Sequence, residues 1–497
     1  MKRHGIHFQP CLFLMGNILI SRMKDSEKLL SLIRNGQKIT LGQQIKLTAL
    51  LSVPAIIAQL STILMQYIDA SMVGSLGAGA SASIGLVSTT TWLFSGLCMA
   101  CATGFSVQVA HKIGARDYDG AKSVLRQGIV STVFFGLLLA AVGNAISGGL
   151  PVWLGGDESI RPDSSSYFSI YALFLPALQM NLLGAGMLRC SGNMKVPSAL
   201  NVLMCILDII FNFFLIFPSR EISLAGISVN VPGAGMGVTG AALGTGLAET
   251  VAAAIMIWYL CARSPQLRIA RKDGSFIPQK ETLRTALKIG VPMGAEHVVI
   301  CGAQIMSTVI VAPLGIFAIA ANSFAVTAES LCYMPGYGIG DAATTLVGQS
   351  IGASRKDLTR SFAWITVSLG IAVMSFMGAI MYWAAPGIIG IMTPVEEIRE
   401  LGTMALRIEA FAEPMFAAAI VSYGVFVGAA NTLVPCLMNF FSIWAVRLTL
   451  AAALAPSMGL KGVWIAMCIE LCFRGIIFLI RLSRGKWMPG NSNLELE

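Results

Sequence analysis

Twelve apolar stretches, each near or above the length that crosses a bilayer, restrict what this chain can fold into. A spanning helix needs about 20 apolar residues, and inside lipid only helices or closed barrels satisfy every backbone group. Apolar residues make up 55% of the chain and charged residues only 12%, which leaves too few polar side chains to cover a water-soluble surface. The sequence therefore predicts an all-α polytopic membrane protein. The predicted spans lie near residues 47–72, 82–110, 124–147, 166–187, 197–217, 237–261, 286–311, 320–348, 360–384, 402–427, 435–455 and 460–481.

The basic residues predict the orientation of these spans. With the N-terminus placed inside, 27 of the 34 Lys and Arg residues fall in inside segments and four in outside loops. Because cytoplasmic loops carry an excess of Lys and Arg, both termini are expected in the cytoplasm and the protein in the inner membrane. The same bias accounts for the net charge of +9, so we expect no nucleic-acid partner.

The two halves of the chain repeat each other in a constant register. Val53-Pro54 aligns with Val291-Pro292, and Ile113-Gly114-Ala115 aligns with Ile351-Gly352-Ala353, both at an offset of 238 in the numbering. After a longer loop in the first half, Met236-Gly237 aligns with Met458-Gly459 at an offset of 222. Six spans per repeat is an even number, so both halves enter the membrane the same way. We therefore predict two six-helix lobes related by a pseudo-two-fold axis along the membrane normal, with substrate sites near the midplane.

The repeat also sets the predicted domain boundaries. The N-terminal lobe is expected over residues 47–261 and the C-terminal lobe over 286–481. A basic cytoplasmic linker, 262–285, joins the lobes, and 482–497 form a cytoplasmic tail.

The first 46 residues are basic and precede the first span. They include a short apolar stretch, CLFLMGNILI (11–20), which is too short to span and is not followed by a small-residue cleavage site. Met23 is an alternative natural start. The stretch from Glu27 to Lys46 is predicted to form a helix on the inner membrane face, so that 1–46 act as a cytoplasmic or interfacial segment.

Several motifs resemble those of one transporter family. Asp69 is closely followed by MVGSLGAGASASIG, and HKIGARDYDGAK (111–122) follows the second span. Further matches are LRCSGNMKVP (188–197), VAPLG (311–315) and LVGQSIGASRKD (346–357). The order of the motifs along the chain, together with their duplication in the two halves, is quite specific. In these features the chain resembles the multidrug and toxic compound extrusion (MATE) family of secondary transporters. The resemblance implies a twelve-helix antiporter that expels cationic, amphipathic compounds in exchange for protons or sodium.

Asp69 is the only acidic or basic residue, histidine apart, between Lys46 and Lys112. An aspartate at the centre of a spanning helix costs roughly 2.5–3.5 kcal/mol on insertion scales, so it is expected to face a polar cavity or to do chemical work. A carboxyl group kept from water can hold a proton and release it to an arriving cation. The alternative is that Asp69 caps the outer end of its helix near Gly74. The family resemblance implies ion coupling at this position.

Asp208 lies in the middle of the fifth span, with Asn212 one helical turn away on the same face. Such a pair could bind sodium or a hydronium ion, anchor an organic cation, or simply form a buried hydrogen bond. Many bacterial members of the family have the asparagine first and the aspartate four residues later. Here the order is reversed, which moves the carboxylate by one turn.

Four further polar residues are predicted to face a substrate cavity: Glu296, His297, Gln304 and Glu413. Some family members have an essential acid eight residues after the proline of the seventh span, but that position is Ile300 here. Another acid of the family aligns with Ala417. Glu296, four residues after Pro292, could serve instead, while His297 could relay protons or simply pack as a hydrogen-bonded side chain. Glu413, one turn after Glu409, lies toward the outer half and fits a vestibule role as well as a coupling role. Glu470 and Arg474, spaced i and i+4, are expected to form a structural salt bridge.

The sequence argues against an enzyme. It contains no G-x-x-x-x-G-K-[ST], HExxH or GxSxG pattern, so neither ATP hydrolysis nor these metal or serine chemistries are indicated. The 11 cysteines lie mostly in apolar runs, and the lone CxxC of Cys98 and Cys101 lacks a second pair of metal ligands. No cofactor and no bound metal are therefore expected, only transported H+ or Na+.

These features together predict a cation-coupled antiporter that exports small organic cations by alternating access and works as a monomer in the bilayer. The alternative is a flippase for lipid-linked saccharides of the same superfamily. Leaving aside the basic residues within three positions of a span end, the predicted spans contain nine acidic and three basic residues, which favours a cationic solute over a phosphate-bearing one.

Overall fold

The computed structural model describes residues 25–224, 227–270 and 274–489, and almost all of its regular structure is helical. Within these residues, eleven helices are long and apolar enough to cross a membrane, and one bent pair makes a twelfth span. The predicted twelve-span architecture is therefore confirmed. The first six spans are α2 (Leu41–Gly74), α3 (Ala78–Gly114), α4 (Tyr118–Ser147), α6 (Arg161–Cys190), α7 (Lys195–Ile216) and α8 (Gly237–Ala262). The last six are α9 (Lys280–Val311), α10 (Ile316–Gly352), α11 (Lys356–Met392), α12 (Glu396–Ala410) with α13 (Glu413–Gly428), α14 (Leu433–Phe441) continued by η2 (Ser442–Leu448) and α15 (Thr449–Met458), and α16 (Leu460–Arg484).

The repeat seen in the sequence recurs in the backbone. Helices α3 and α10 begin and end at repeat-equivalent positions. Their flanking turns match as well, because Gly77 and Gly315 both have positive φ before these helices. Arg116 and Ser354, which are also repeat equivalents, both adopt the left-handed conformation that non-glycine residues usually avoid. The duplication therefore extends to single strained residues, and not only to the order of helices.

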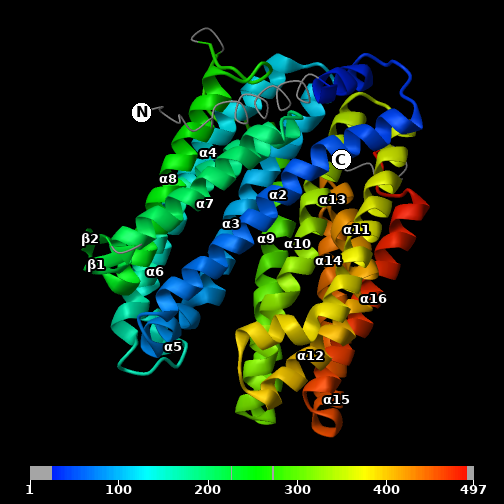
Figure 1. Cartoon of the computed structure of the whole chain (residues 1–497). Helices are drawn as coiled ribbons and strands as arrows, with labels where there is room; N and C mark the ends of the chain where they lie inside the picture. The colour runs from blue at the N-terminus through cyan, green and yellow to red at the C-terminus, as the bar shows by residue number, and fades with distance from the viewer. Residues whose placement is uncertain (1–24, 225–226, 271–273, 490–497) are drawn as a thin grey trace, which may run out of the picture.

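The two lobes meet at one end of the molecule and diverge toward the other (Figure 1). We call the end that holds residues 25–36 and the end of α16 the basic end, and the opposite one the distal end. Most contacts between the lobes come from α2 against α10, α3 against α9, and α3 against α10. At the last of these, a Cβ on Gly114 would lie 2.2 Å from the Gln349 carbonyl oxygen, and one on Gly352 would lie 2.0 Å from that of His111. Only glycine allows this crossing, and the repeat relates its two contacts, since Gly114 is equivalent to Gly352 and His111 to Gln349.

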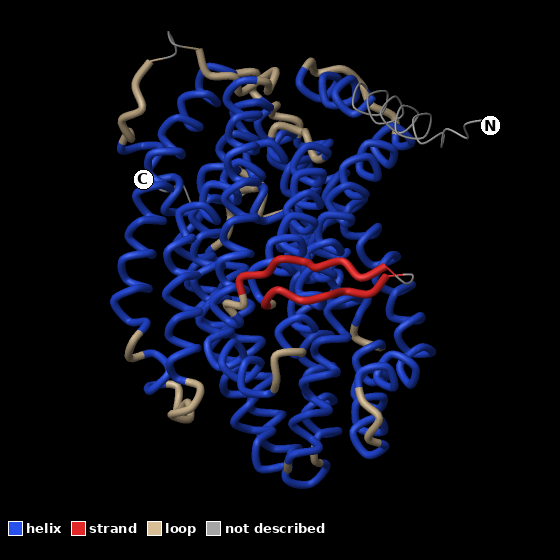
Figure 2. Tube along the Cα trace, turned by 60° about the vertical axis from the view of Figure 1, so that its left-hand side comes forward, coloured by secondary structure: helices blue, strands red, loops and turns tan. Residues whose placement is uncertain are grey.

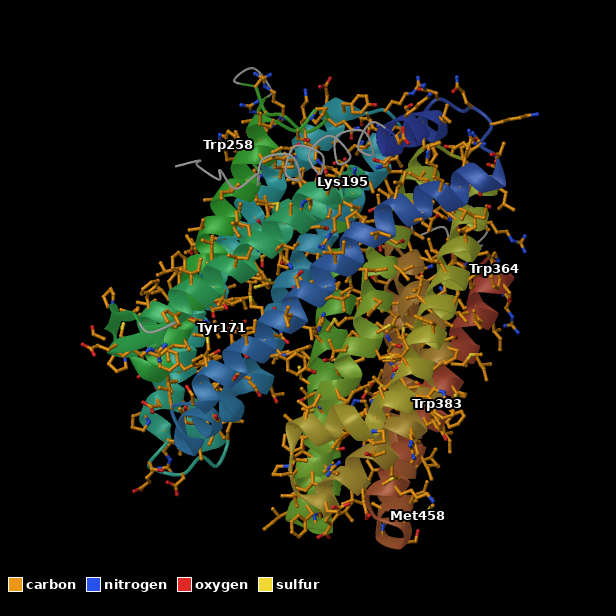
Figure 3. All side chains as sticks on the ribbon, in the orientation of Figure 1. Tyr171, Lys195, Trp258, Trp364, Trp383 and Met458 are labelled. Carbon is orange, nitrogen blue, oxygen red and sulfur yellow. The ribbon has the colours of Figure 1, made fainter. Side chains whose placement is uncertain are left out.

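Aromatic residues on the outside of the C-terminal lobe fit a lipid environment. Trp364 and Trp383 both lie on α11 at different heights (Figure 3). Trp383 is 80% exposed, which would be costly in water and is expected for a ring that faces lipid or its headgroup region.

The N-terminal segment differs from the single helix predicted over Glu27–Lys46. Residues 25–34 are helical, but the chain turns at Gly36, whose φ is +70°, and α2 begins only at Leu41. Thr40 and Gln43 form a capping box that fixes the start of α2. The predicted helix over Glu27–Lys46 was therefore wrong, because a glycine and a strong N-cap divide it. The alternative start at Met23 and the apolar stretch 11–20 lie outside the described residues.

The loop between the fifth and sixth spans contains two strands that were not predicted from the sequence. Strands β1 (Pro218–Leu224) and β2 (Ile227–Ala234) pair antiparallel, with an irregularity between Pro218 and Arg220 (Figure 2). Arg220 stacks on Phe213 and Phe217 at the end of α7, 4.8 and 4.1 Å from the ring centroids. These cation–π contacts attach the first strand to the helix that carries Asp208.

The tenth span is broken, unlike its repeat equivalent. α12 and α13 meet at an angle of 59°, next to Pro414. The equivalent Pro176 lies inside the continuous α6. Proline alone therefore does not break this span, and the break belongs to the C-terminal lobe only.

Candidate functional site

Asp69, Asp208 and Asn212 form one polar cluster inside the N-terminal lobe. The amide Nδ2 of Asn212 donates to Asp69 Oδ1 at 2.9 Å and to Asp208 Oδ2 at 3.2 Å. Asp208 and Asn212 are fully buried, and Asp69 is half-buried. The two carboxyl groups thus lie on either side of one amide nitrogen. Asp69 is bound to α7 rather than to the end of its own helix, which ends at Gly74.

Helix geometry explains how these side chains converge. Asp208 and Asn212 are four residues apart on α7, so both point to the same side, toward α2 and α8. On α8, a Cβ at Gly244 would lie 2.0 Å from Asn212 Oδ1. Glycine at this position therefore leaves the space that the asparagine amide occupies.

Two oxygen atoms of the cluster remain unsatisfied. Oδ1 of Asp208 and Oδ1 of Asn212 are buried without a hydrogen-bond donor in the described part of the chain. A buried acceptor without a donor costs about 1–3 kcal/mol, so such atoms are usually explained by an unseen proton, ion or water. The oxygens of Asp69, Asp208 and Asn212 are the hard ligands that a proton or a sodium ion would use.

A second acid of the N-terminal lobe, Glu249, has a neutral partner. Asn181 Nδ2 donates to Glu249 Oε1 at 2.6 Å and also faces Met204 Sδ at 3.7 Å. Both side chains come from helices that flank the cluster, α6 and α8. The sequence placed Glu249 within a span but left its partner open, because an asparagine on another helix carries no recognisable spacing.

A central cavity of about 200 Å³ lies between the lobes, at the depth where they meet. Glu296 and His297, two of the four residues expected to face a cavity, line it. Asn439 donates a short hydrogen bond to Glu296 Oε1, while Glu296 Oε2 is buried without a donor among the described residues. The ring of His297 packs on Gly96 of α3, where a Cβ would lie 2.4 Å from its Cγ. The aromatic lining of the cavity is made by Tyr337, Phe416 and Tyr423.

The cavity also contains both signs of charge. Arg189 of α6 forms an ion pair with Asp341 of α10 at 3.2 Å, and this pair connects the two lobes. Arg474 is held by Glu470 through two contacts of 2.8 Å, so the predicted salt bridge is confirmed. Ser442 adds a hydrogen bond of 2.6 Å to Glu470 Oε1. Each cavity arginine is therefore already neutralised by its own carboxylate.

The other two predicted cavity residues lie elsewhere. Gln304 is exposed on the distal half of α9 and is not part of the cavity lining. Glu413 is fully buried at the break between α12 and α13, one turn from the equally buried Glu409. Neither carboxylate accepts a hydrogen bond from an N–H or O–H group among the described residues. Glu413 thus faces no open vestibule in this conformation, although it remains an unsatisfied acid inside the lobe.

The cysteines form no site in the described part of the chain. Ten of them, Cys98 and Cys101 included, are free thiols, and no group of three or more His, Cys, Asp or Glu side chains among the described residues could hold a metal ion.

Comparison with known proteins identifies the family. The MatE family model matches residues 54–214 and again 292–452, two blocks in the same register as the internal repeat. Together the two blocks cover more than half of the chain.

Relatives of similar length support this assignment. "Probable multidrug resistance protein NorM" of Thermotoga maritima is 26% identical over 443 residues, which cover 88% of this chain and 92% of the relative. "Uncharacterized transporter YisQ" of Bacillus subtilis is 26% identical over 396 residues, covering 78% and 83% of the two chains.

Solved structures share the fold. The structure described as "Crystal structure of MATE in complex with MaL6" superposes with a TM-score of 0.82 at 20% identity, covering 92% of this chain and 99% of the other. A mutant of the Vibrio cholerae MATE transporter VcmN superposes with a TM-score of 0.81 at 18% identity, covering 90% and 98%. The repeated family matches, the relatives matched over most of their length and the shared fold lead to one conclusion. This chain belongs to the MatE family, the multidrug and toxic compound extrusion family of multi-pass membrane transporters.

Proposed function

We propose that this protein is a secondary exporter that exchanges H+ or Na+ for organic, amphipathic cations by alternating access. It works as a monomer in the inner membrane, with the basic end in the cytoplasm. The observation that carries the proposal is the buried arrangement of Asp69 and Asp208 around one amide of Asn212. Names of relatives that refer to multidrug resistance agree with export of such compounds.

The cluster has the chemistry that ion coupling requires. Two neighbouring carboxylates that share a single amide donor repel one another when both are charged. A proton or sodium ion would relieve that repulsion and satisfy the free oxygens of Asp208 and Asn212. Organic cation and coupling ion then compete for the same charge, and the coupling free energy between two ligands is reciprocal.

The lobe arrangement supports an exchange between two faces. The lobes touch near the basic end and separate toward the distal end, which describes a transporter open to the outside under the proposed orientation (Figure 1). Rocking one lobe against the other about the central cavity would expose it to the cytoplasm instead. No step of this scheme needs ATP, since the energy of an ion gradient drives it.

The test is efflux of a fluorescent organic cation from energised vesicles, under a proton gradient or a sodium gradient in turn. Asp69→Asn should abolish efflux while leaving expression and membrane insertion unchanged. Asp119→Asn is the matched control, since this carboxylate lies exposed at the basic end with its side chain 96% accessible. Unchanged efflux in Asp69→Asn would remove Asp69 from the mechanism.

The flippase alternative has one observation in its favour. Two guanidinium groups, Arg189 and Arg474, line the central cavity and could meet a phosphate. Both are already paired with carboxylates, which lowers their capacity to bind a second anion. If no organic cation moves under either gradient, while a fluorescent phosphate-bearing lipid is translocated, the flippase function replaces the antiporter.

A further inference from the structure

The helix of residues 25–34 lies across the junction of the two lobes at the basic end. Its apolar residues Leu29, Leu30 and Ile33 are buried, the last two completely. They belong to one hydrophobic cluster with residues of both lobes. The N-terminal lobe contributes Leu47, Leu51, Ala55 and Met194, and the C-terminal lobe contributes Ala342, Leu346, Leu358 and Phe362. An interfacial helix would turn such residues toward lipid, but here they are buried between the lobes.

Arg34 binds both lobes at once. Its side chain is only 3% exposed and pairs with Glu27 of the same segment at 2.8 Å. Its Nε donates to Gln349 Oε1 on α10 at 3.2 Å, and its Nη2 donates to the Ser191 carbonyl just after α6 at 3.3 Å. Gln349 in turn donates to the Cys190 carbonyl at 2.8 Å. A single guanidinium therefore connects the ends of α6 and α10, which belong to different lobes.

Each lobe also supplies an arginine to the end of this segment. Arg116, after α3, donates to the Arg34 carbonyl at 2.9 Å and to the Asn35 side chain. Arg355, after α10, donates to the Gln37 carbonyl at 3.1 Å. The carbonyls at a helix end carry partial negative charge, so cations stabilise this position.

Any motion that separates the basic ends of the lobes must break one of these sets of contacts. We propose that residues 25–37 are a bolt that holds the basic end closed, with Arg34 as its central contact, and that the protein can open to the cytoplasm only when the bolt leaves at least one lobe. This inference rests on the alternating access proposed above. It adds a conformational lock, outside the transport path, that sets how often the inward-open state is visited.

The bolt can be tested by measuring the distance between the lobes at the basic end. Spin labels at Asp119→Cys and Arg360→Cys, exposed residues of α4 and α11, report this separation in lipid nanodiscs by electron paramagnetic resonance. Cys11 is replaced by serine throughout; the ten cysteines in the described part of the chain are buried or half-buried. We expect the long-distance population to rise at least tenfold in Arg34→Gln, which corresponds to about 1.4 kcal/mol.

Matched variants separate the bolt from general damage. Arg284→Gln removes an exposed guanidinium at the same end and should leave the distances unchanged. Arg34→Lys keeps the charge but loses the fork of donors, so it should fall between wild type and Arg34→Gln. The double variant Leu30→Asp/Ile33→Asp keeps Arg34 but removes the apolar side chains that pack this segment between the lobes. It should also increase the long-distance population.

The outcomes decide the proposal without a transport assay. If both Arg34→Gln and the Leu30/Ile33 double variant keep the wild-type distances, the segment is only a surface cover and the bolt is refuted. If the distances lengthen while wild type exports no cation, the bolt stands and the proposed function fails. Because the readout is lobe separation, the two ideas are tested independently.

Discussion

At the scale of single residues, Gly244 matters because it leaves the space for Asn212. A Cβ at this position would lie 2.0 Å from Asn212 Oδ1. We therefore expect Gly244→Ala to displace the amide from Asp69 and Asp208, and to reduce cation efflux at least tenfold. Gly85→Ala is the control, since nothing lies within 4 Å of its Cβ and alanine favours a helix by about 0.5–1 kcal/mol. Efflux and thermal unfolding of both variants check this, and equal behaviour of the two would contradict it.

The ion pair of Glu470 and Arg474 allows a prediction about stability. Glu470 is fully buried, so Glu470→Gln would leave the guanidinium of Arg474 without its countercharge. Breaking a buried pair from one side typically costs about 3–5 kcal/mol, whereas replacing both partners by apolar residues is often neutral. Glu470→Gln should lower the unfolding temperature in detergent markedly, and Glu470→Leu with Arg474→Met should recover most of it. A double variant as unstable as the single one would show that the pair itself is required.

The sequence identified the charged residues of the site better than their partners. Asp69 and Asp208 could be singled out because a lone carboxylate in an apolar run is costly. That Asn212 would contact Asp69 as well depended on how α2 and α7 pack, which no spacing reveals. Asn439 had a visible signal, since it repeats Asn201 in the duplication. Asn201 binds the Ala58 carbonyl at 2.9 Å, and the repeat equivalent of Ala58 is Glu296, the partner of Asn439.

At the scale of helices, the crossing of α3 and α10 should leave no room for a side chain at either of its glycines. Gly114→Ala and Gly352→Ala would each push a Cβ into a backbone carbonyl of the other helix. Overpacking of this kind costs about 1–3 kcal/mol. Since both changes separate the same two helix ends, the double variant should lose less than the sum of the single ones.

Thermal unfolding in detergent measures these costs. Gly387→Ala on α11, with nothing within 4 Å of its Cβ, serves as the control and should be neutral or slightly stabilising. Strictly additive losses would mean that the two glycines act at independent places, and the shared crossing would be wrong.

The sequence predicted those helices that are determined by the length of an apolar stretch or by the internal repeat. Apolar length and the internal repeat predicted all twelve spans, because the bilayer admits little else. The break between α12 and α13 was not predictable, since Pro176 and Pro414 are equivalent and only one lobe breaks. The stretch Glu27–Lys46 was predicted to lie on the membrane surface, because the sequence does not show what covers its apolar side chains. The position of the 25–34 helix between the lobes is determined by tertiary packing alone.

At the scale of the whole molecule, the two repeats share the arrangement of their spans but not their buried polar residues. The repeat equivalents of Asp69, Asp208 and Asn212 are Ser307, Val446 and Leu450, so the polar cluster has no counterpart in the C-terminal lobe. The C-terminal lobe instead buries Glu409 and Glu413 around its broken span. The two lobes share the order of their spans, but under the proposed function only the N-terminal lobe is expected to sense the ion, through Asp69.

Rocking requires that the lobes slide apart where they now touch, and a covalent link there should stop it. Gly294 of α9 and Ala100 of α3 belong to different lobes, and a Cβ on Gly294 would lie 3.9 Å from that of Ala100. This separation falls in the range of about 3.5–4.5 Å found in disulfides. In a background with Cys98→Ala and Cys101→Ser, oxidised Ala100→Cys/Gly294→Cys should lose cation efflux, and reduction should restore it.

Each single cysteine variant should be indifferent to oxidant, since neither can link the lobes. Efflux is compared before and after reduction, with the crosslinked fraction measured by accessibility to a thiol reagent. Full efflux from quantitatively crosslinked protein would mean that the contact between α3 and α9 persists throughout the cycle. Transport would then have to proceed by movements within one lobe, and the rigid-body exchange between two faces would be abandoned.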